Sequence, residues 1–294
     1  MFKLFKYDFR AIAKRLIPLY IVGIVIGTLN VGVSLVANHY FKNTFSQGIT
    51  PVYMIMQIIG MLSSFIFSII VIYISILTIY ILITNFNSSV YGNEGYLINS
   101  LPIKSRELIL AKYLNFVFWT FVANLFGLIF QAIRVFLELE KFVKNIGEKE
   151  INDIFRELSL RKNELLNNPL LPTIIILGII IIICMILFSL LNSWIFMTSV
   201  TVANVIKSNK IVIGILTYFL INFGIGIISL IIFFMSVFEW SKIENYPGNG
   251  IEIVDIVLKI YIKYGIIYMI FLILLNIGTS FFINHIHSKK LDLE

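Results

Sequence analysis

The chain has 294 residues, of which 59% are hydrophobic and 13% are charged. Soluble domains carry about 25% charged residues, so this composition excludes an ordinary soluble protein and indicates an integral membrane protein. The net charge of +7 would suggest nucleic-acid binding in a soluble chain. In a membrane protein the positions of the charges explain it better, and no nucleic-acid partner is expected. The single cysteine, Cys184, lies in an apolar run and cannot form an intrachain disulfide.

Six apolar runs are long enough to cross a membrane, which takes roughly 20 apolar residues in a helix. Lipid offers the backbone no hydrogen-bond partner, so each run is expected to be a helix. The runs are too long and too uniformly apolar for barrel strands. The expected spans are residues 16–38, 55–86, 113–135, 170–197, 211–238 and 264–284. The second run is longer than the hydrocarbon requires, so it should tilt or continue as a helix beyond it. The predicted fold class is an all-α integral membrane protein with six transmembrane helices.

The first fifteen residues predict an amphipathic helix at the membrane interface. Apolar residues recur at helical spacing on one face: Phe2, Phe5, Phe9 and Ile12. Basic residues recur on the adjacent face: Lys3, Lys6, Arg10 and Lys14. This pattern is typical of a helix lying among lipid headgroups, and an elbow helix that also touches a partner is the alternative. No small-residue cleavage site follows the first apolar run, so an uncleaved span is expected rather than a secretory signal.

Basic residues near the span ends predict the orientation, because cytoplasmic loops carry the excess of Lys and Arg. One side of the membrane holds both termini and the second and fourth loops, and its charge is clearly positive. Its basic residues are Lys3, Lys6, Arg10, Lys14, Arg15, Lys104, Arg106, Lys112, Lys207, Lys210, Lys289 and Lys290. On the other side, basic and acidic residues balance. Both termini are therefore expected in the cytoplasm.

The segment between the second and third spans, residues 87–112, is charged and broken by proline. Residues 94–100 can form about two helical turns, and Pro102 disfavours helix at the residue before it. Ser105 can then cap a new helix that has Glu107 in its first turn. Several apolar residues would be exposed unless they meet something: Tyr96, Leu97, Leu101 and Ile103. Exposed apolar residues beside charges indicate a docking surface, and contact with lipid headgroups is an equal alternative.

Two longer segments are expected on the external side. In residues 139–169, apolar residues follow the i, i+3, i+4, i+7 pattern of a helix: Ile151, Ile154, Phe155 and Leu158. This segment is expected to be helical, either as a solvated connector or as a lid that contacts substrate. Residues 239–263 are expected to form the last external loop, with a turn at Pro247-Gly248-Asn249-Gly250.

The sequence lacks the groups that catalysis would need. It has no GxxxxGK[ST] phosphate-binding loop, no HExxH motif and no Cys/His cluster. We therefore expect no catalytic, cofactor-binding or metal-ligating residue on this chain. The pair His285 and His287 is interpreted as a solvated span end. Ionisable residues, which mark proton relays and carriers, are nearly absent from the spans, so energy for active transport would have to come from another protein.

Polar and small residues within the spans are interpreted first as packing groups. The amides are expected to bond between helices, and lining a polar path is the alternative. They are Asn30, Gln57, Asn115, Asn124, Gln131, Asn192, Asn222 and Asn276. Two glycine pairs, Gly23-x-x-x-Gly27 and Gly224-x-Gly226, are expected to let helices approach closely.

The stretch from Gly92 to Lys112 resembles the segment between the second and third spans of bacterial ABC-transporter permeases of the type-2 exporter family, in one Gram-positive branch. The residues that carry the resemblance are Gly92, Glu94, Gly95, Tyr96, Leu97, Leu101, Pro102, Lys104, Arg106, Leu108, Leu110 and Lys112. The opening residues 4–10 and the closing residues 289–294 also fit that branch. Asn99-Ser100 stands where Thr is more usual before Leu-Pro.

The resemblance implies that the segment contains a coupling helix, which inserts into a cleft of a separate ATP-binding subunit. The implied contact residues are Glu94, Gly95, Tyr96, Leu97, Leu101, Pro102, Lys104 and Arg106. It also implies ATP and Mg²⁺ on the partner subunit, a second permease subunit that is identical or homologous, contact with membrane lipid, and a bacterial cytoplasmic membrane. An amphipathic, peptide or lipid-like cargo fits the apolar spans, and immunity to antimicrobial peptides fits the branch.

The chain is accordingly expected to have four parts. These are an interfacial helix (1–15), spans one to three with the coupling loop 87–112 (16–138), the external helical segment (139–169), and spans four to six with a short tail (170–294). The leading hypothesis is an ATP-driven export permease. A stand-alone channel or carrier would need more polar span linings, and a structural or sensory membrane protein would dock a different partner through the same loop.

Overall fold

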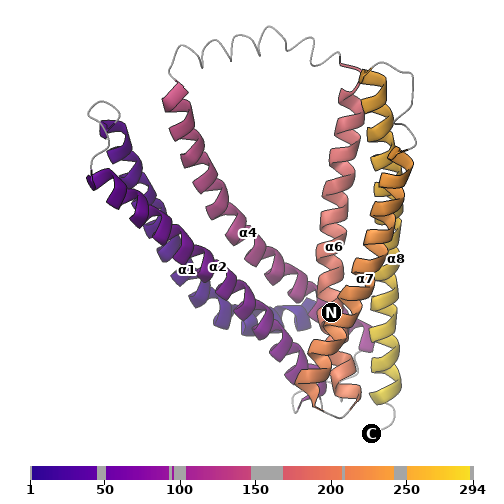
Figure 1. Ribbon diagram of the computed structural model, residues 1–294. Helices are drawn as coiled ribbons and strands as arrows, with labels where there is room; N and C mark the ends of the chain where they lie inside the picture. The colour runs from indigo at the N-terminus through magenta and orange to yellow at the C-terminus, as the bar shows by residue number, and fades with distance from the viewer. Residues whose placement is uncertain are drawn as a thin grey trace. The chain divides into compact units, whose positions relative to one another are not determined.

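The computed structural model describes residues 2–44, 51–92, 95, 104–146, 168–206, 209–241 and 250–291. In these ranges it contains the helices α1 (Phe2–Thr44), α2 (Pro51–Tyr91), α4 (Ser105–Ile146), α6 (Leu171–Val205), α7 (Lys210–Ser241) and α8 (Gly250–Leu291) (Figure 1). Each of these six is long and apolar enough to cross a membrane, and the described ranges contain no strand. The predicted all-α fold with six spans is confirmed, and α2 extends well beyond the hydrocarbon requirement, as expected.

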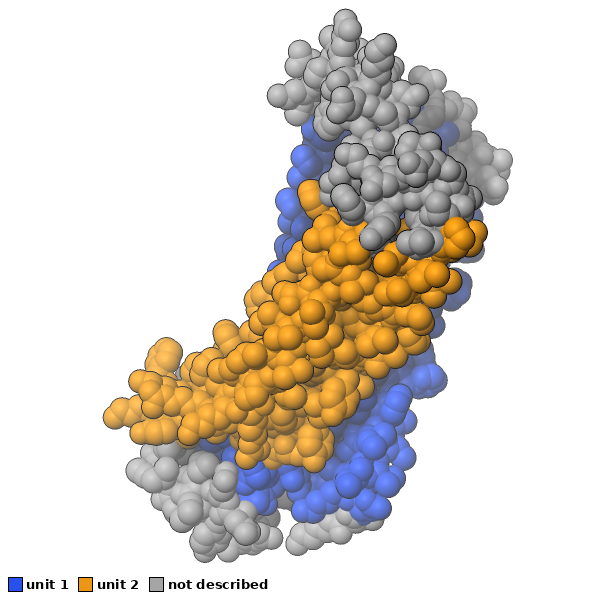
Figure 2. All heavy atoms as spheres, turned by 90° about the vertical axis from the view of Figure 1, so that its left-hand side faces the viewer, with its two compact units in different colours: residues 1, 86–113, 160–294 blue, residues 2–85, 114–159 orange. Residues whose placement is uncertain are grey.

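The chain divides into two compact units, coloured separately in Figure 2. Unit 1 comprises residue 1, residues 86–113 and residues 160–294, and unit 2 comprises residues 2–85 and 114–159. The last turn of α2 and the first turns of α4 belong to unit 1, whereas the longer parts of both helices belong to unit 2. Both ends of the 87–112 segment, which is predicted to dock a partner, therefore belong to unit 1.

Unit 2 is held together by close helix contacts at small residues. A Cβ added to Gly23 would lie 2.6 Å from Ile74 Cδ1 and 2.7 Å from Phe126 Cζ, and one added to Gly27 would overlap the ring of Phe130. Those neighbours lie on α2 and α4, so the predicted role of this glycine pair in close helix packing is confirmed. Tyr20 adds a hydrogen bond of 3.0 Å between its hydroxyl and that of Thr78 on α2.

Two of the span amides in unit 2 bond between helices, as predicted. Asn30 Nδ2 donates to Ser63 Oγ across α1 and α2 at 2.7 Å. Asn115 Nδ2, on α4, donates to the backbone carbonyl of Phe5 on α1 at 3.3 Å. In lipid such bonds satisfy polar groups that water cannot reach, which is why amides recur at helix contacts.

The predicted interfacial residues occupy the first turns of α1, with no break before the first span. The basic side chains Lys3, Lys6, Arg10 and Lys14 are all exposed. Of the predicted apolar face, Ile12 is buried but Phe2 is 84% exposed, so the amphipathic interfacial helix stays a prediction. Pro18 lies inside α1 and cannot donate the helical backbone bond, a common cause of bending. Figure 1 shows that α1 bends, with its first turns running across the direction of the rest.

Unit 1 packs α6, α7 and α8 around an apolar core. The core residues are Leu191 and Ile195 of α6, Ile225 of α7 and Leu272 of α8. Asn276 Nδ2 of α8 donates to the carbonyl of Leu187 on α6 at 3.1 Å, another predicted bond between helices.

The close packing predicted at Gly224 and Gly226 is wrong. A Cβ at either position would meet no heavy atom within 4 Å among the described residues. Both glycines lie on α7, and in the described parts of unit 1 no side chain packs on them as those of α2 and α4 pack on the glycines of α1. The spacing of small residues alone does not say which face of a helix is covered.

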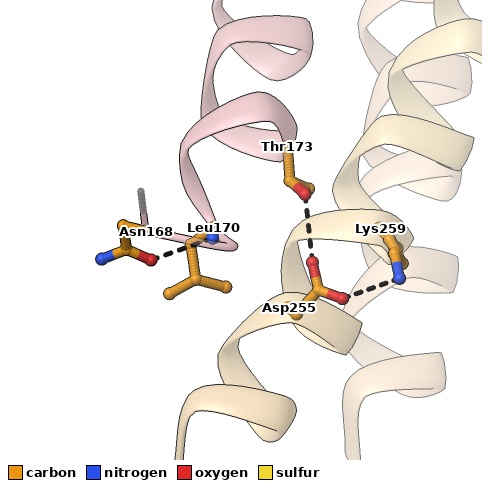
Figure 3. Close-up of polar contacts among 5 residues, drawn as sticks. All are labelled: Asn168, Leu170, Thr173, Asp255 and Lys259. Atoms are coloured by element: carbon orange, nitrogen blue, oxygen red, sulfur yellow. Dashed lines mark hydrogen bonds and ion pairs between the residues drawn. The ribbon is translucent and has the colours of Figure 1, made fainter. Parts of the chain in front are cut away.

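The expected last loop, residues 239–263, is also largely wrong, because α7 continues to Ser241 and α8 already begins at Gly250. Polar contacts support this early start (Figure 3). Thr173 Oγ1 of α6 donates to Asp255 Oδ1 at 3.0 Å, and Lys259 Nζ lies 2.7 Å from Asp255 Oδ2, one helical turn on. At the adjoining start of α6, the Leu170 amide donates to Asn168 Oδ1 at 2.9 Å. The helical pattern of residues 151–158 and most of the Pro-Gly turn lie outside the described residues.

Candidate functional site

Three of the predicted partner-contact residues are described, namely Gly95, Lys104 and Arg106. The others, Glu94, Tyr96, Leu97, Leu101 and Pro102, lie outside the described residues. The candidate site is therefore best defined by the two ends of the 87–112 segment and by what holds them.

The chain leaves α2 through a tight turn at which two positions require glycine. The Gly95 amide donates to the Gly92 carbonyl at 2.9 Å. A Cβ at Gly95 would lie 2.5 Å from the Val90 carbonyl oxygen and 2.7 Å from its carbon, and one at Gly92 would lie 2.7 Å from the Ser88 oxygen. These neighbours are backbone atoms of the last turns of α2, which cannot rotate away. The two glycines let the backbone at these positions lie close against the last turns of α2, which fixes both residues relative to that helix.

At the other end of the segment, α4 begins at Ser105 with Glu107 in its first turn. The Lys104 carbonyl accepts the backbone amides of Glu107 at 2.8 Å and Leu108 at 3.3 Å. Lys104 therefore occupies the N-cap position, and the prediction that Ser105 caps this helix is wrong by one residue. Lys104 and Arg106 are both exposed. Two cations thus project from the start of α4, next to the loop.

The end of α2 is tied to the end of α6 by polar side chains. Tyr91 Oη donates to Thr201 Oγ1 at 3.0 Å, and Thr201 Oγ1 in turn donates to the Met197 carbonyl at 2.9 Å. Asn204 Nδ2 donates to Asn87 Oδ1 at 2.6 Å. Thr201 is completely buried, so this chain of hydrogen bonds is shielded from competing water.

The start of α4 is tied to the middle of α6 by aromatic stacking. The rings of Tyr113 and Trp194 lie 4.0 Å apart and 13° from parallel, and the Tyr113 hydroxyl donates to the Leu190 carbonyl at 3.5 Å. Aromatic pairs of this kind add about 0.5–1.5 kcal/mol beyond the area they bury. Both ends of the 87–112 segment are therefore anchored on the same helix, α6.

His287 of α8 completes the anchor of Tyr91, and the prediction that the His285/His287 pair is a solvated span end is wrong for His287. Its side chain is only 2% exposed, and its ring lies 6.3 Å from the ring of Tyr91 at 84°. Among the described residues, neither of its ring nitrogens has a hydrogen-bond partner. His285 is exposed, as expected. Local sequence could not distinguish the two, because burial depends on which side of α8 meets α2.

No local sequence pattern singles out the anchoring residues, although two of them flank the motif. Tyr91 directly precedes Gly92, and Tyr113 directly follows Lys112. Their partners Thr201 and Trp194 are about a hundred residues away in the sequence, so no local pattern pairs them. Among the described residues, no group of three or more His, Cys, Asp or Glu is placed to hold a metal ion.

A match to a known protein family includes the 87–112 segment. The model of the ABC-2 family transporter protein matches residues 40–155, which include all of α2, the 87–112 segment and α4. The match covers residues 40–155 of the 294, and it supports an ABC-2-type permease. The comparisons with curated proteins and with solved structures found no match to this chain.

The match and the six apolar helices agree on a multi-pass membrane protein that serves as the permease component of an ABC transporter. Permeases of this family generally lack an ATPase site of their own and work with an ATP-binding subunit. The resemblance seen in the sequence is thereby confirmed at the level of the family, and the Gram-positive branch stays a prediction.

Proposed function

We propose that this permease couples ATP hydrolysis on a separate subunit to the export of an amphipathic peptide or lipid-like molecule. The partner subunit would hold ATP and Mg²⁺, and a second permease subunit, identical or homologous, would complete the transporter. The membrane is the bacterial cytoplasmic membrane, with both termini inside, as the basic residues favour. Immunity to antimicrobial peptides is the biological role that the branch suggests.

One observation carries the mechanism: the two ends of the 87–112 segment are both anchored on α6. Tyr91 binds Thr201 beside the exit from α2, and Tyr113 stacks on Trp194 near the entry to α4. A force applied to the loop between them would therefore reach α6 through a buried hydrogen bond and a stacked pair. An unanchored loop would move without moving the spans.

The work would come from the partner. An ATPase dimer that binds ATP more tightly in its closed state shifts the population of the whole complex towards that state. With the loop seated in the ATPase, closure would pull on the segment, and α6 would move with it. The predicted contact residues are Glu94, Gly95, Tyr96, Leu97, Leu101, Pro102, Lys104 and Arg106.

The test is co-purification of the tagged chain from native membranes, with identification of the proteins that accompany it. An ABC ATP-binding subunit should accompany the parent chain and be lost in the Tyr96→Ala/Leu97→Asp double variant. The matched control is Ile251→Asp, which places the same charge at an exposed residue at the start of α8. Purification of the parent chain without any ATPase, under conditions that preserve membrane complexes, would refute the proposal and favour a stand-alone or structural role.

Sidedness has its own test, because Cys184 is the one cysteine of the chain. In a Cys184→Ala background, a cysteine introduced in place of Lys104 should be protected from a membrane-impermeant maleimide in intact cells and should react after lysis. A cysteine in place of Ile251 should react in intact cells. The reverse pattern would show that the termini and the 87–112 segment face outward.

A further inference from the structure

Unit 1 contains a groove of about 590 Å³ at the start of α4, which falls within the usual size range of ligand sites, about 300–1,000 Å³. It lies among α4, α6 and α8. Its walls are formed by Arg106, Tyr113, Leu187, Leu190, Trp194, Ile273, Asn276, Ile277, Ser280, Phe281 and Asn284. The Tyr113–Trp194 stack that anchors α4 on α6 is thus also a wall of this groove.

The groove has two chemically different parts. Leu187, Ile273, Ile277 and Phe281 provide an apolar surface along α6 and α8. Arg106 is the one charged residue of the lining, and no ion pair or hydrogen bond to its guanidinium is found among the described residues. Arginine presents a planar set of donors that matches phosphate oxygens, so an unpaired arginine beside an apolar surface favours a ligand with a phosphate and a hydrocarbon tail.

A second polar atom in the lining also needs a partner. Asn284 Nδ2 donates to the Ser280 carbonyl at 2.8 Å, but the Asn284 Oδ1 atom is buried without a partner among the described residues. By contrast, the Asn276 amide group donates to two backbone carbonyls, those of Leu187 and Leu272. Because the Asn284 carbonyl oxygen is itself buried, a ligand in the groove reaches it only if this side chain rotates.

We propose that this groove binds an anionic phospholipid, with its phosphate on Arg106 and one acyl chain along α6 and α8. The hydrophobic effect does not select this occupant, since the lipid tails of the bilayer are as apolar as the groove. Selection comes from the charge of Arg106, and basic pockets between spans on the cytoplasmic side are known to suit anionic headgroups. Assignment to the cytoplasmic leaflet rests on the orientation given under the proposed function.

The site also has a place in the transport cycle. Arg106 lies two residues after the N-cap of α4, and Tyr113 and Trp194 belong both to the groove and to the anchor on α6. A bound lipid would fill the space beside the stacked pair. Movement of the 87–112 segment and occupancy of the groove would then affect one another through the same residues.

The experiment uses the purified full-length chain in phosphatidylcholine nanodiscs that contain a small fraction of phosphatidylglycerol with a photoreactive diazirine in one acyl chain. After illumination, labelled peptides are mapped by mass spectrometry. Label should concentrate on residues 273–281 and 187–194. No ATPase is present, so the result is independent of the coupling test above.

Two pairs of variants test the two parts of the groove. Arg106→Gln should lower the labelling of these peptides about tenfold, because a charge-assisted contact is lost, whereas Lys104→Gln should change it less than twofold. Ile277→Trp should block the apolar part, whereas Leu274→Trp should not. Ile277 and Leu274 lie one turn apart on α8 and are 62% and 63% exposed, but only Ile277 lines the groove.

Several results would overturn the proposal. Label spread evenly over the exposed isoleucines of all spans would indicate bulk lipid only. An equal loss in Lys104→Gln and Arg106→Gln would indicate general surface charge. Full competition by inorganic phosphate would indicate a free-anion site, and crosslinks between two copies of the chain at residues 273–281 would indicate that a second permease covers the groove.

Discussion

Replacing Gly95 by alanine should loosen the loop that follows α2. The added Cβ would lie 2.5 Å from the Val90 carbonyl oxygen and 2.7 Å from its carbon. Carbon atoms do not approach backbone this closely, and neither neighbour can rotate away. The backbone must therefore shift, and the hydrogen bond from the Gly95 amide to the Gly92 carbonyl, 2.9 Å in the parent chain, must lengthen.

The free-energy cost of the added Cβ can be taken from other overpacked sites in proteins. Forcing an extra methyl group into a filled space costs about 1–3 kcal/mol. If this cost falls on the closed form of the loop, the local opening equilibrium rises about 5- to 150-fold, since each 1.4 kcal/mol is a factor of ten. Amide exchange that proceeds through local opening should accelerate by the same factor.

The assay is hydrogen–deuterium exchange with mass spectrometry on the full chain in detergent or nanodiscs, following peptides that cover residues 90–106. The control is Gly278→Ala on α8, where a Cβ would meet no heavy atom within 4 Å. Alanine favours helix over glycine by about 1 kcal/mol, so this control should not accelerate exchange anywhere. Exchange over residues 90–106 that is unchanged in Gly95→Ala would refute the idea that close backbone contact fixes the loop.

Two further predictions concern the anchors and the helix contacts. Tyr91→Phe removes the hydrogen bond to Thr201 and should lower the free energy of unfolding by about 0.5–1.5 kcal/mol. The loss is measured as a lower melting temperature in detergent. An unchanged melting temperature would mean that this bond does not hold α2 on α6. Gly27→Ala forces a Cβ into the ring of Phe130 and should destabilise the chain by about 1–3 kcal/mol in the same assay. The control Gly226→Ala should not destabilise it. Equal effects of the two substitutions would contradict the packing of α1 on α4.

Local sequence patterns were sufficient for the membrane helices, because the cause of each helix lies within its own residues. An apolar run longer than about 20 residues has no other stable state in lipid than a helix. The helix ends were less predictable. Residues 250–263 contain charges and were expected in a loop, yet α8 includes them, with Asp255 paired to Lys259 and bound by Thr173 of α6. That support comes from a residue about eighty positions earlier in the sequence.

The sequence motif located the candidate site, but no sequence pattern predicted the contacts that hold the site on α6. The sequence pointed to the 87–112 segment through its glycines, its proline and its exposed apolar residues, and the family match covers the same stretch. The contacts that anchor it, from Tyr91 to Thr201 and from Tyr113 to Trp194, join residues that have no sequence relationship to one another. A tyrosine beside a loop has the same local pattern whether it meets lipid, water or another helix.

The sequence by itself determined that the protein lies in a membrane and how many spans it has, since composition and run length act locally. It also predicted, from its proline and glycine positions, where a partner would dock. Only the tertiary structure decided which faces of the helices are covered. It buried His287 while leaving His285 exposed, packed Gly27 against Phe130 while leaving Gly226 open, and placed Arg106 at a groove shared with Trp194. Each of these outcomes depends on the rotation of one helix against another, and that rotation is fixed by contacts between residues far apart in the chain.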